Sequence, residues 1–363
     1  MTPSQDAAYM ARALKLANNG LYTTDPNPHV GCVLVKNGEI LAEGWTQRAG
    51  FAHAEIDALS KTAQAAGATA YVTLEPCSHV GKTGPCCDAL IAAGISRVVV
   101  AMEDPNPLVA GRGLKKMREA GIEVVCGVLL QEAQLLNKGF FKRMSQGLPW
   151  IRSKLAMSLD GRTAMASGES QWITSPQARQ DVQRWRAASS AILTGIDTVL
   201  YDDPQLNARV DFEVLQPVKV VLDSKLRLPL TAKILQNAVD VWLFTCSDDF
   251  GKQQQLRDVG CKVFQVEATN GRVDLPQLFS LLAQLQINTV WVEAGATLNG
   301  SLLQSGLVDE WLIYMAPCIL GDEGRGLFHL PGLQHMQDKK TLHLTDVRQL
   351  GVDLRLCYRP VSH

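Results

Sequence analysis

The stretch from His53 to Cys87, HAEIDALSKTAQAAGATAYVTLEPCSHVGKTGPCC, contains the motifs that decide the fold of the first half of the chain. It places His53 at the start of one helical pattern, and Cys77 and Cys86, with eight residues between them, at the start of the next. Zinc binds imidazole nitrogen and thiolate sulfur, and a catalytic zinc keeps one position for water. The dipole at a helix start also favours a thiolate. The spacing therefore predicts a catalytic zinc site made by His53, Cys77 and Cys86.

Glu55 lies two residues after His53, so it can reach a bound water without being a ligand. Its predicted role is catalytic: it takes a proton from the water and delivers it to a leaving amine. Zinc deaminases combine His-x-Glu with Pro-Cys-x-x-Cys. The cysteine spacing is longer here, which adds only a small loop-closure cost.

Two other interpretations of the cysteines stay open. They could be buried thiols, or they could belong to a structural zinc site with His79 or Cys87 as the fourth ligand. Cys87 adjoins Cys86 and would point away from it in a helix. Two thiolates and an imidazole favour zinc over iron without proving the metal.

Composition limits what the whole chain can be. It has 363 residues, 46% of them hydrophobic, which is too long for one ordinary core and predicts two domains. The formal net charge of -1 argues against nucleic acid as a partner. No apolar run reaches membrane-spanning length, and the polar-rich first residues do not resemble a secretory signal. Nine cysteines, an odd number, favour a reducing cytoplasmic location.

Strand patterns alternate with helical patterns throughout, which predicts α/β domains. In the first half we expect a helix over 7–17 with Ser4 as its N-cap, a hairpin of strands 30–35 and 40–45, and a helix over 53–66. Later expected strands in this half are 70–74, 98–102 and 122–126, and the expected helices are 86–93 and 113–120. The strand pattern restarts at Trp150 after a boundary stretch over 139–149. We therefore predict domains at 1–147 and 148–363.

The first half resembles the deaminase half of the bifunctional riboflavin biosynthesis deaminase/reductase family. The resemblance rests on Asn27-Pro-His-Val-Gly31, His53-Ala-Glu55, Glu75-Pro-Cys-Ser-His79, Gly81-Lys-Thr83, Pro85-Cys-Cys87 and Asp104-Pro-Asn-Pro107. It implies a cytidine-deaminase-like α/β/α fold and removal of an amine from 2,5-diamino-6-(5-phosphoribosylamino)pyrimidin-4-one. It also implies substrate contacts from Asn27, His79, Lys82, Asp104 and Asn106. Gly84 stands where the family usually has proline, a change that removes no ligand.

In the second half, polar clusters follow several expected strands. They start at Lys154, Ser167, Gly195 and Val292. Ligands of open α/β sheets gather at the carboxyl ends of strands, and the predicted helix start after Gly295 suits a phosphate. No Gly-x-Gly-x-x-Gly fingerprint is present, so a Rossmann domain is not supported.

Together these clusters resemble the reductase half of the same family, in the same order. The resemblance implies a dihydrofolate-reductase-like α/β fold, NADPH as the cofactor, and reduction of the ribosyl group of the deaminated product to ribityl. The implied cofactor contacts are Ala156, Trp172, Thr198, Asp202, Ser224, Gly295, Ala296, Thr297, Leu298, Asn299, Gly300 and Ser301. The implied substrate contacts are Lys154, Ser170, Arg186, Leu206, Arg209 and Glu293. The two arginines suit phosphate, which a guanidinium binds through two parallel hydrogen bonds.

Two rival functions fit the sequence less well. A nucleic-acid-editing deaminase with an appended binding domain needs a basic groove, which the near-neutral charge does not favour. A catalytically inactive scaffold would not need Glu55 beside His53. The expected partner is a small phosphoribosylaminopyrimidine, with no nucleic acid and no membrane. The sequence leaves open whether the chain forms a homo-oligomer.

Overall fold

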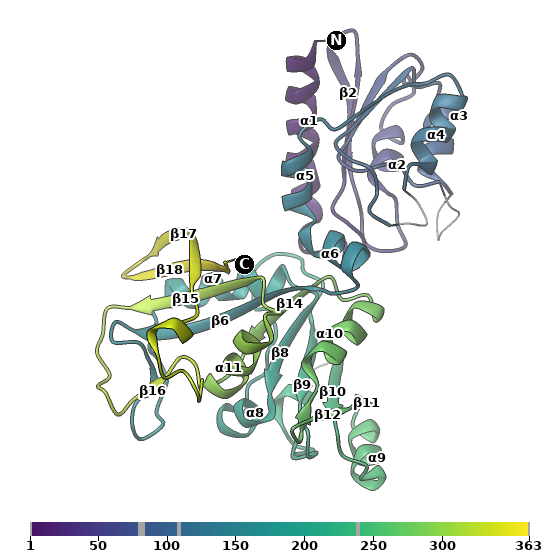
Figure 1. The fold of residues 1–363 in the computed structure, drawn as a ribbon. Coiled ribbons are helices and arrows are strands. Elements are labelled where there is room, and N and C mark those ends of the chain that lie inside the picture. The colour runs from purple at the N-terminus through teal and green to yellow at the C-terminus, as the bar shows by residue number, and fades with distance from the viewer. Residues whose placement is uncertain (1, 79–83, 107–109, 237–239, 362–363) are drawn as a thin grey trace. The chain divides into compact units, whose positions relative to one another are not determined.

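The computed structural model describes residues 2–78, 84–106, 110–236, 240–361, which fall into two compact units, Met1–Gly147 and Leu148–His363. Each unit is an α/β layer structure, as the alternating patterns predict (Figure 1). In the described part of the chain, no helix is both long and apolar enough to cross a membrane.

The first unit contains a five-stranded sheet of order β2-β1-β3-β4-β5. Its strands are β1 (Gly31–Lys36), β2 (Glu39–Trp45), β3 (Thr69–Val72), β4 (Arg97–Val100) and β5 (Glu123–Cys126). Strand β1 runs antiparallel to β2 and β3, whereas β3, β4 and β5 are parallel. The hairpin turns at Asn37 and Gly38, which both have positive φ, as an Asn-Gly turn requires.

Helices cover both faces of this sheet (Figure 1). Helices α1 (Pro3–Ala17) and α5 (Leu130–Leu136) lie on one face, and α2 (Ala54–Leu59), α3 (Cys86–Ala92) and α4 (Arg112–Glu119) lie on the other. The last helix is α6 (Lys138–Gln146), and a short 3-10 turn η1 (Asn18–Gly20) follows α1. The core between the layers is made of buried residues such as Leu34, Tyr71 and Val99.

Two local expectations for this unit are wrong. The N-cap of α1 is Thr2 and not Ser4, because Pro3 suits the first helical position and Gln5 completes a capping box with Thr2. Helix α2 ends at Leu59 and does not reach Ala66. A third feature agrees with expectation: the two units divide between Gly147 and Leu148, inside the boundary stretch over 139–149, where helix α6 ends at Gly147 in the left-handed conformation.

The second unit contains a nine-stranded sheet of order β11-β10-β9-β8-β14-β6-β15-β18-β17. Its strands are β6 (Trp150–Ser158), β8 (Ala191–Gly195), β9 (Val218–Leu222), β10 (Val241–Thr245), β11 (Cys261–Gln265), β14 (Thr289–Glu293), β15 (Glu310–Ala316), β17 (Leu342–Leu350) and β18 (Asp353–Pro360). In this order, the first seven strands, from β11 at one edge to β15, are all parallel. Strands β18 and β17 then add an antiparallel hairpin. Two small ribbons pair β7 (Arg162–Ala164) with β16 (Arg325–Gly326) and β12 (Ala268–Thr269) with β13 (Arg272–Val273).

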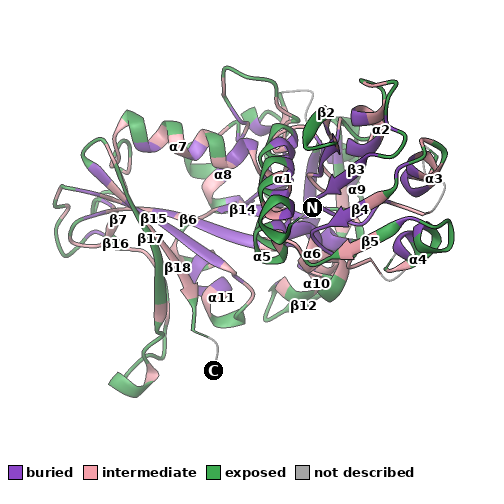
Figure 2. Cartoon of the chain, turned by 90° about the horizontal axis from the view of Figure 1, so that it is seen from above, coloured by how far each residue is buried: buried purple, intermediate pink, exposed green. Residues whose placement is uncertain are grey.

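The large sheet has a separate core on each face. One core includes residues of α7 (Pro176–Ala187), α8 (Ile196–Asp202) and α9 (Phe250–Asp258), and the other includes residues of α10 (Leu275–Gln284) and α11 (Ala296–Ser305). Two 3-10 turns, η2 (Lys233–Leu235) and η3 (Met336–Asp338), complete the unit. Figure 2 shows the buried strands between helices whose outer faces are exposed. The sheet therefore presents the carboxyl ends of β6, β8, β9 and β14 along one edge.

Candidate functional site

In the first unit the structure brings His53, Cys77 and Cys86 together. His53 directly precedes α2, Cys77 lies in the loop after β3, and Cys86 is the first residue of α3. Their ligand atoms all lie within 4.8 Å of one another. His53 Nδ1 is 3.3 Å from Cys86 Sγ and 3.7 Å from Cys77 Sγ. The arrangement offers one nitrogen and two sulfur atoms, a donor set that fits zinc.

The two thiols respond oppositely to their surroundings. Hydrogen bonding with Cys86 and His53 lowers the pKa of Cys77, and the Cys86 backbone N–H donates to Cys77 Sγ at 3.3 Å. Hydrogen bonding with Cys77 and burial raise the pKa of Cys86. Their mutual hydrogen bonding therefore makes Cys77 the more acidic of the two thiols. Metal binding would release any proton still on the two thiols, because zinc ligands must be deprotonated.

Glu55 lies in the first turn of α2, beside this cluster. It is only 4% exposed. Burial, followed by the charge of Cys77, raises the pKa of Glu55 to about 7. A carboxyl group with a pKa near neutrality can both accept and donate a proton, as a deaminase requires.

Cys87 does not join the cluster. Its side chain is fully buried in the hydrophobic core of the unit, and burial raises its pKa to about 11. His79, the other suggested fourth ligand, lies outside the described residues, as does Lys82. Among the described residues the metal-binding group has three members, the number of protein ligands typical of a catalytic zinc.

A close contact between sheet and helix fixes the start of α2. A Cβ atom on Gly44 of β2 would lie 2.3 Å from the Ala54 carbonyl oxygen and 2.4 Å from the Ala58 nitrogen. Only glycine lets β2 approach α2 so closely. The contact holds the helix that begins directly after His53 and contains Glu55.

The predicted substrate residues that the structure describes lie at the same edge of the sheet. Asp104 and Asn106 follow β4, whose carboxyl end lies beside that of β3. The Asn106 backbone N–H donates to Asp104 Oδ1 at 2.8 Å. Asn27 precedes β1, which is antiparallel to β3, so it enters the sheet at this edge too. These residues therefore lie at the edge of the sheet where the Cys77 loop follows β3.

Sequence reasoning gave no role to Glu75, which the structure makes prominent. Its buried carboxylate accepts hydrogen bonds from the backbone N–H groups of Asp104, Gly111, Gly113 and Leu114. The only available signal was an acidic residue at a strand end directly before Pro76-Cys77.

In the second unit, an ion pair lies at the carboxyl edge of the sheet. Arg186 of α7 donates to both carboxylate oxygens of Glu293, at 2.6 and 2.9 Å, and to the Asn207 carbonyl oxygen at 3.1 Å. Burial raises the pKa of Glu293, but Arg186, with help from Lys154 and Trp291, brings it down to about 2. Arg186 thus directs two of its donors at Glu293, and its predicted contact with the substrate phosphate stays a prediction.

Lys154 pairs in register with Glu293 across β6 and β14. Burial and the nearby Arg186 charge lower the pKa of Lys154, which Glu293 partly opposes. Its Nζ lies 6.0 Å from the centre of the Tyr314 ring. Arg209 is exposed, and its pKa is lowered by burial of part of the side chain and by the Arg186 charge. These groups place positive charge around a fixed carboxylate.

The helix starts after two neighbouring strands fit a cofactor phosphate. Gly295 begins α11 with no side-chain cap, and Gly195 begins α8 in the same way. A Cβ atom on Gly195 would lie 3.6 Å from Leu298, so the two helix starts are adjacent. Backbone N–H groups at such starts bind anions. The residues present therefore fit the phosphates of NADPH.

Part of the predicted cofactor turn is buried instead. Asn299 is fully buried, its side chain donating to the Ala294 carbonyl oxygen and accepting from Ser153. Gly300 is also buried, and a Cβ atom there would lie 2.0 Å from the His329 carbonyl oxygen. Both residues therefore shape the first turns of α11, and their predicted contact with the cofactor stays a prediction. Ala296, Thr297, Leu298 and Ser301 retain some exposure.

The remaining predicted residues are spread along the same edge. Trp172 is 71% exposed and lies under Arg179, whose guanidinium is 4.5 Å from the ring centre. Asp202, whose pKa is raised by burial, accepts from Gln171 at 3.5 Å. Leu206 is buried in the core, so its side chain has little surface for substrate. The others, all partly exposed, are Ala156, Ser170, Thr198 and Ser224.

Comparison with protein-family models gives a match for each unit. Residues 3–102 match the cytidine and deoxycytidylate deaminase zinc-binding region, and residues 149–356 match the RibD C-terminal domain. The riboflavin biosynthesis protein RibD of Escherichia coli is 52% identical, over 97% of this chain and 98% of that protein. RibD of Haemophilus influenzae is 50% identical, over 98% of each chain.

Solved structures agree over the whole length. RibD of Acinetobacter baumannii (form 1) superposes with a TM-score of 0.93 and 48% identity, covering 99% of this chain and 100% of that one. A diaminohydroxyphosphoribosylaminopyrimidine deaminase/5-amino-6-(5-phosphoribosylamino)uracil reductase from Thermotoga maritima gives a TM-score of 0.87 and 33% identity, covering 99% of each chain. Both halves of the chain, in the same order, are thus matched.

Proposed function

This chain belongs to the RibD family of riboflavin biosynthesis proteins, and from that membership we propose which residues carry each of its two activities. The chain is a deaminase and a reductase, with zinc and NADPH as its cofactors. The nucleic-acid-editing alternative is not favoured, since relatives match across both halves. The single observation that carries the deaminase assignment is the His53, Cys77 and Cys86 cluster with buried Glu55 beside it.

The first reaction is hydrolytic deamination of 2,5-diamino-6-(5-phosphoribosylamino)pyrimidin-4-one. His53, Cys77 and Cys86 would hold zinc, which when bound lowers the pKa of water enough to supply a nucleophile at neutral pH. Glu55 accepts a proton from that water and passes it to the leaving amine. Asn27, Asp104 and Asn106 lie where they can bind the substrate, and His79 and Lys82 are proposed to join them.

The second reaction is reduction of the ribosyl group of the deaminated product to ribityl. NADPH supplies the hydride, and its phosphates would bind at the adjacent starts of α8 and α11. Trp172, Asp202 and Ser224 complete the proposed cofactor contacts. Lys154 lies beside the Arg186–Glu293 pair and is proposed to face the sugar, with Ser170 and Arg209 also on the substrate side.

Each activity is assigned to one unit, residues 1–147 for the deaminase and 148–363 for the reductase. The metal cluster and Glu55 lie wholly in the first unit, and the proposed NADPH residues lie wholly in the second. Fragments with these bounds test the assignment. If both are folded and the second fragment fails to bind NADPH in a titration, the division of labour is wrong.

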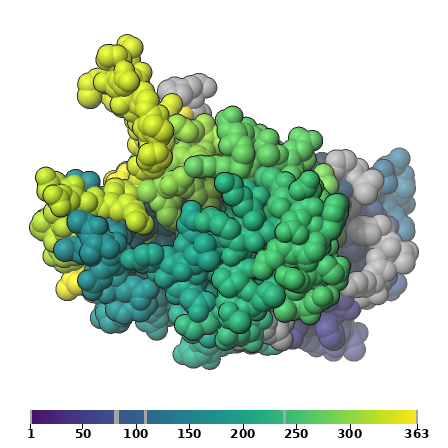
Figure 3. All heavy atoms as spheres, turned by 90° about the horizontal axis from the view of Figure 1, so that it is seen from below, coloured from purple at the N-terminus to yellow at the C-terminus, as the bar shows by residue number. Residues whose placement is uncertain are grey.

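We propose a reducing, cytoplasmic location, because the nine cysteines are all free in the structure. We also propose a homo-oligomer. Residues 343–349 of the edge strand β17 are all exposed, including Leu344 and Val347, and the segment near η3 stands out from the surface of its unit (Figure 3). A long exposed edge can pair with a second copy. Light scattering measures the mass in solution, and a monomer would contradict the proposal.

The function is tested by a coupled assay on the full chain loaded with zinc. The phosphoribosyl-diaminopyrimidine should release ammonia without NADPH, and NADPH oxidation should begin only after deamination. Ammonia release without later NADPH oxidation would remove the reductase assignment. Activity on single-stranded nucleic acid would instead support the editing enzyme.

A further inference from the structure

The loop that carries Cys77 is held on two sides by different helices. On one side, Cys86 N–H donates to Cys77 Sγ and Cys87 N–H donates to the Cys77 carbonyl oxygen at 3.2 Å. On the other side, a Cβ atom on Gly113 of α4 would lie 2.2 Å from the Pro76 carbonyl oxygen. The backbone of α4 therefore lies against the peptide that precedes the metal ligand.

The start of α4 has no cap of its own. Its N-cap residue is Gly111, which has positive φ and no side chain to accept a hydrogen bond. The first N–H groups of a helix need acceptors from outside the helix. Glu75 provides them: Oε1 accepts from Gly113 at 2.9 Å and Leu114 at 3.3 Å, and Oε2 accepts from Gly111 at 2.9 Å.

The same carboxylate also holds the segment that follows β4. Asp104 N–H donates to Glu75 Oε2 at 3.2 Å, and Asp104 in turn accepts from Asn106 N–H. Glu75 is 4% exposed, and its own N–H donates to the Met102 carbonyl oxygen at 3.0 Å. One buried side chain thus joins the Cys77 loop, the start of α4 and the Asp104–Asn106 segment.

We propose that Glu75 is a positioning residue of the deaminase, which fixes the metal ligand Cys77 and the substrate segment at Asp104 relative to each other. The proposal rests on the deaminase function stated above. A carboxylate suits this position because it has only acceptors, and its four partners among the described residues are all backbone N–H donors. Glutamine would turn an NH2 group toward donors and leave part of the set unpaired.

The test compares full-length Glu75→Gln with Asp6→Asn. Asp6 is a matched control, because it is a buried acid of the same unit that accepts hydrogen bonds, from Arg97 and Tyr71. Arg97 begins β4, so this network lies at the opposite end of the strand from the segment that Glu75 holds. Three readouts are taken on each sample: KM and kcat for ammonia release, zinc retention against a chelator, and NADPH-dependent reduction of the deaminated compound.

For Glu75→Gln we expect kcat/KM of deamination to fall about 10- to 100-fold, mainly through KM, with zinc lost at lower chelator concentration, since groups that orient metal ligands have effects of this size. The reductase rate should not change. Asp6→Asn should lower the unfolding temperature and leave KM and zinc retention alone.

Wild-type KM and zinc retention in Glu75→Gln would overturn the proposal, and so would an equal KM shift in Asp6→Asn. Should Glu75→Gln not fold, Glu75→Asp keeps the charge on a shorter side chain and should show a smaller change of the same kind. A wild-type chain that releases no ammonia would refute the proposed function instead, and the chelator titration would still report on Glu75.

Discussion

The two sites are assembled in different ways. In the first unit, the metal cluster comes from residues between 53 and 86, at the starts of two helices and in the loop after one strand. In the second unit, Lys154, Arg186 and Glu293 meet only because β6 and β14 pair in parallel and α7 packs against them. The first site depends on local spacing and the second on strand register. A substitution at the first site should therefore change activity or zinc binding with little effect on stability. A substitution at the second site should change stability together with activity.

The sharpest test of this contrast is Glu55→Gln. Glutamine keeps the size of the side chain but cannot carry the proton, so deamination should fall about 100- to 10,000-fold. Zinc content and the reductase rate should stay at wild-type values, because Glu55 is not a ligand and lies in the other unit. Ammonia release and zinc per chain are the measurements. Near-normal ammonia release would remove the role assigned to Glu55.

The neighbouring residues Cys86 and Cys87 test whether only one of them is a zinc ligand. Cys86→Ser should strongly reduce zinc per chain, because Cys86 Sγ faces His53. Cys87→Ser should keep the zinc and instead destabilise the first unit, because it places a hydroxyl group in the core. Zinc analysis and thermal unfolding of both variants decide the matter. Equal zinc loss would mean that the ligand choice is wrong.

In the second unit, the main effect of Arg186→Met should be a lower free energy of unfolding, and not only a change in the kinetics of the reductase. Removing the partner of a buried carboxylate costs about 3–5 kcal/mol, and the pKa of Glu293 should rise from about 2. The control is Arg186→Met combined with Glu293→Gln, which removes the unpaired charge and should recover part of the loss. Denaturant unfolding measures both. If Arg186→Met raised only the KM of the reductase, Arg186 would be a phosphate ligand after all.

The sequence allowed the metal cluster to be predicted because its residues stand in short motifs at element starts. It also allowed strands β1 and β2 to be placed within one residue of their observed bounds. The resemblance assigns Asn299 and Gly300 to the cofactor, whereas their burial depends on contacts with Ser153 and His329, which are distant in sequence. The ion pair of Arg186 with Glu293 and the hydrogen bonds of Glu75 with α4 also join residues that are distant in sequence. The spacing of motifs along the chain does not reveal such contacts.

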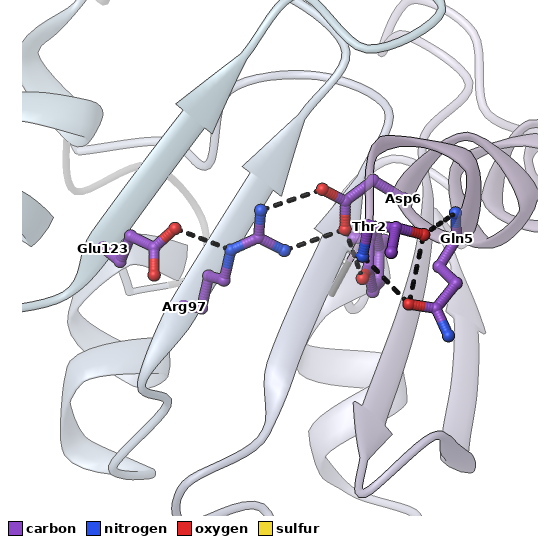
Figure 4. Close-up of polar contacts among 6 residues, drawn as sticks. Thr2, Gln5, Asp6, Arg97 and Glu123 are labelled. Carbon is purple, nitrogen blue, oxygen red and sulfur yellow. Dashed lines mark hydrogen bonds and ion pairs between the residues drawn. The ribbon is translucent and has the colours of Figure 1, made fainter.

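The smallest expected effect is a dependence of the stability of the first unit on acidic pH. Far from the metal cluster, Arg97 donates to both oxygens of Asp6 at 2.8 Å and to Glu123 at 2.8 Å (Figure 4). The hydrogen bonds from Arg97, and a further one from Tyr71, lower the pKa of Asp6 below its ordinary value of 3.8. The stabilisation is therefore complete above pH 3.8 and is lost as the pH falls through the lower pKa of the folded state.

At pH 7, Asp6→Asn should lower the stability of the first unit by about 1.5–3 kcal/mol, the usual value of hydrogen bonds to a charged group. The gap between wild type and variant should close as the pH falls below the ordinary carboxyl pKa. Calorimetry at each pH measures this difference in stability. Every sample contains a chelator, because loss of zinc in acid would otherwise destabilise both proteins. The transition of the first unit is the one that added zinc raises at pH 7. Glu123→Gln, at the exposed end of the same network, should cost less than about 1 kcal/mol. A difference in unfolding free energy that stays constant down to pH 2 would show that the contribution of Asp6 does not depend on its ionisation.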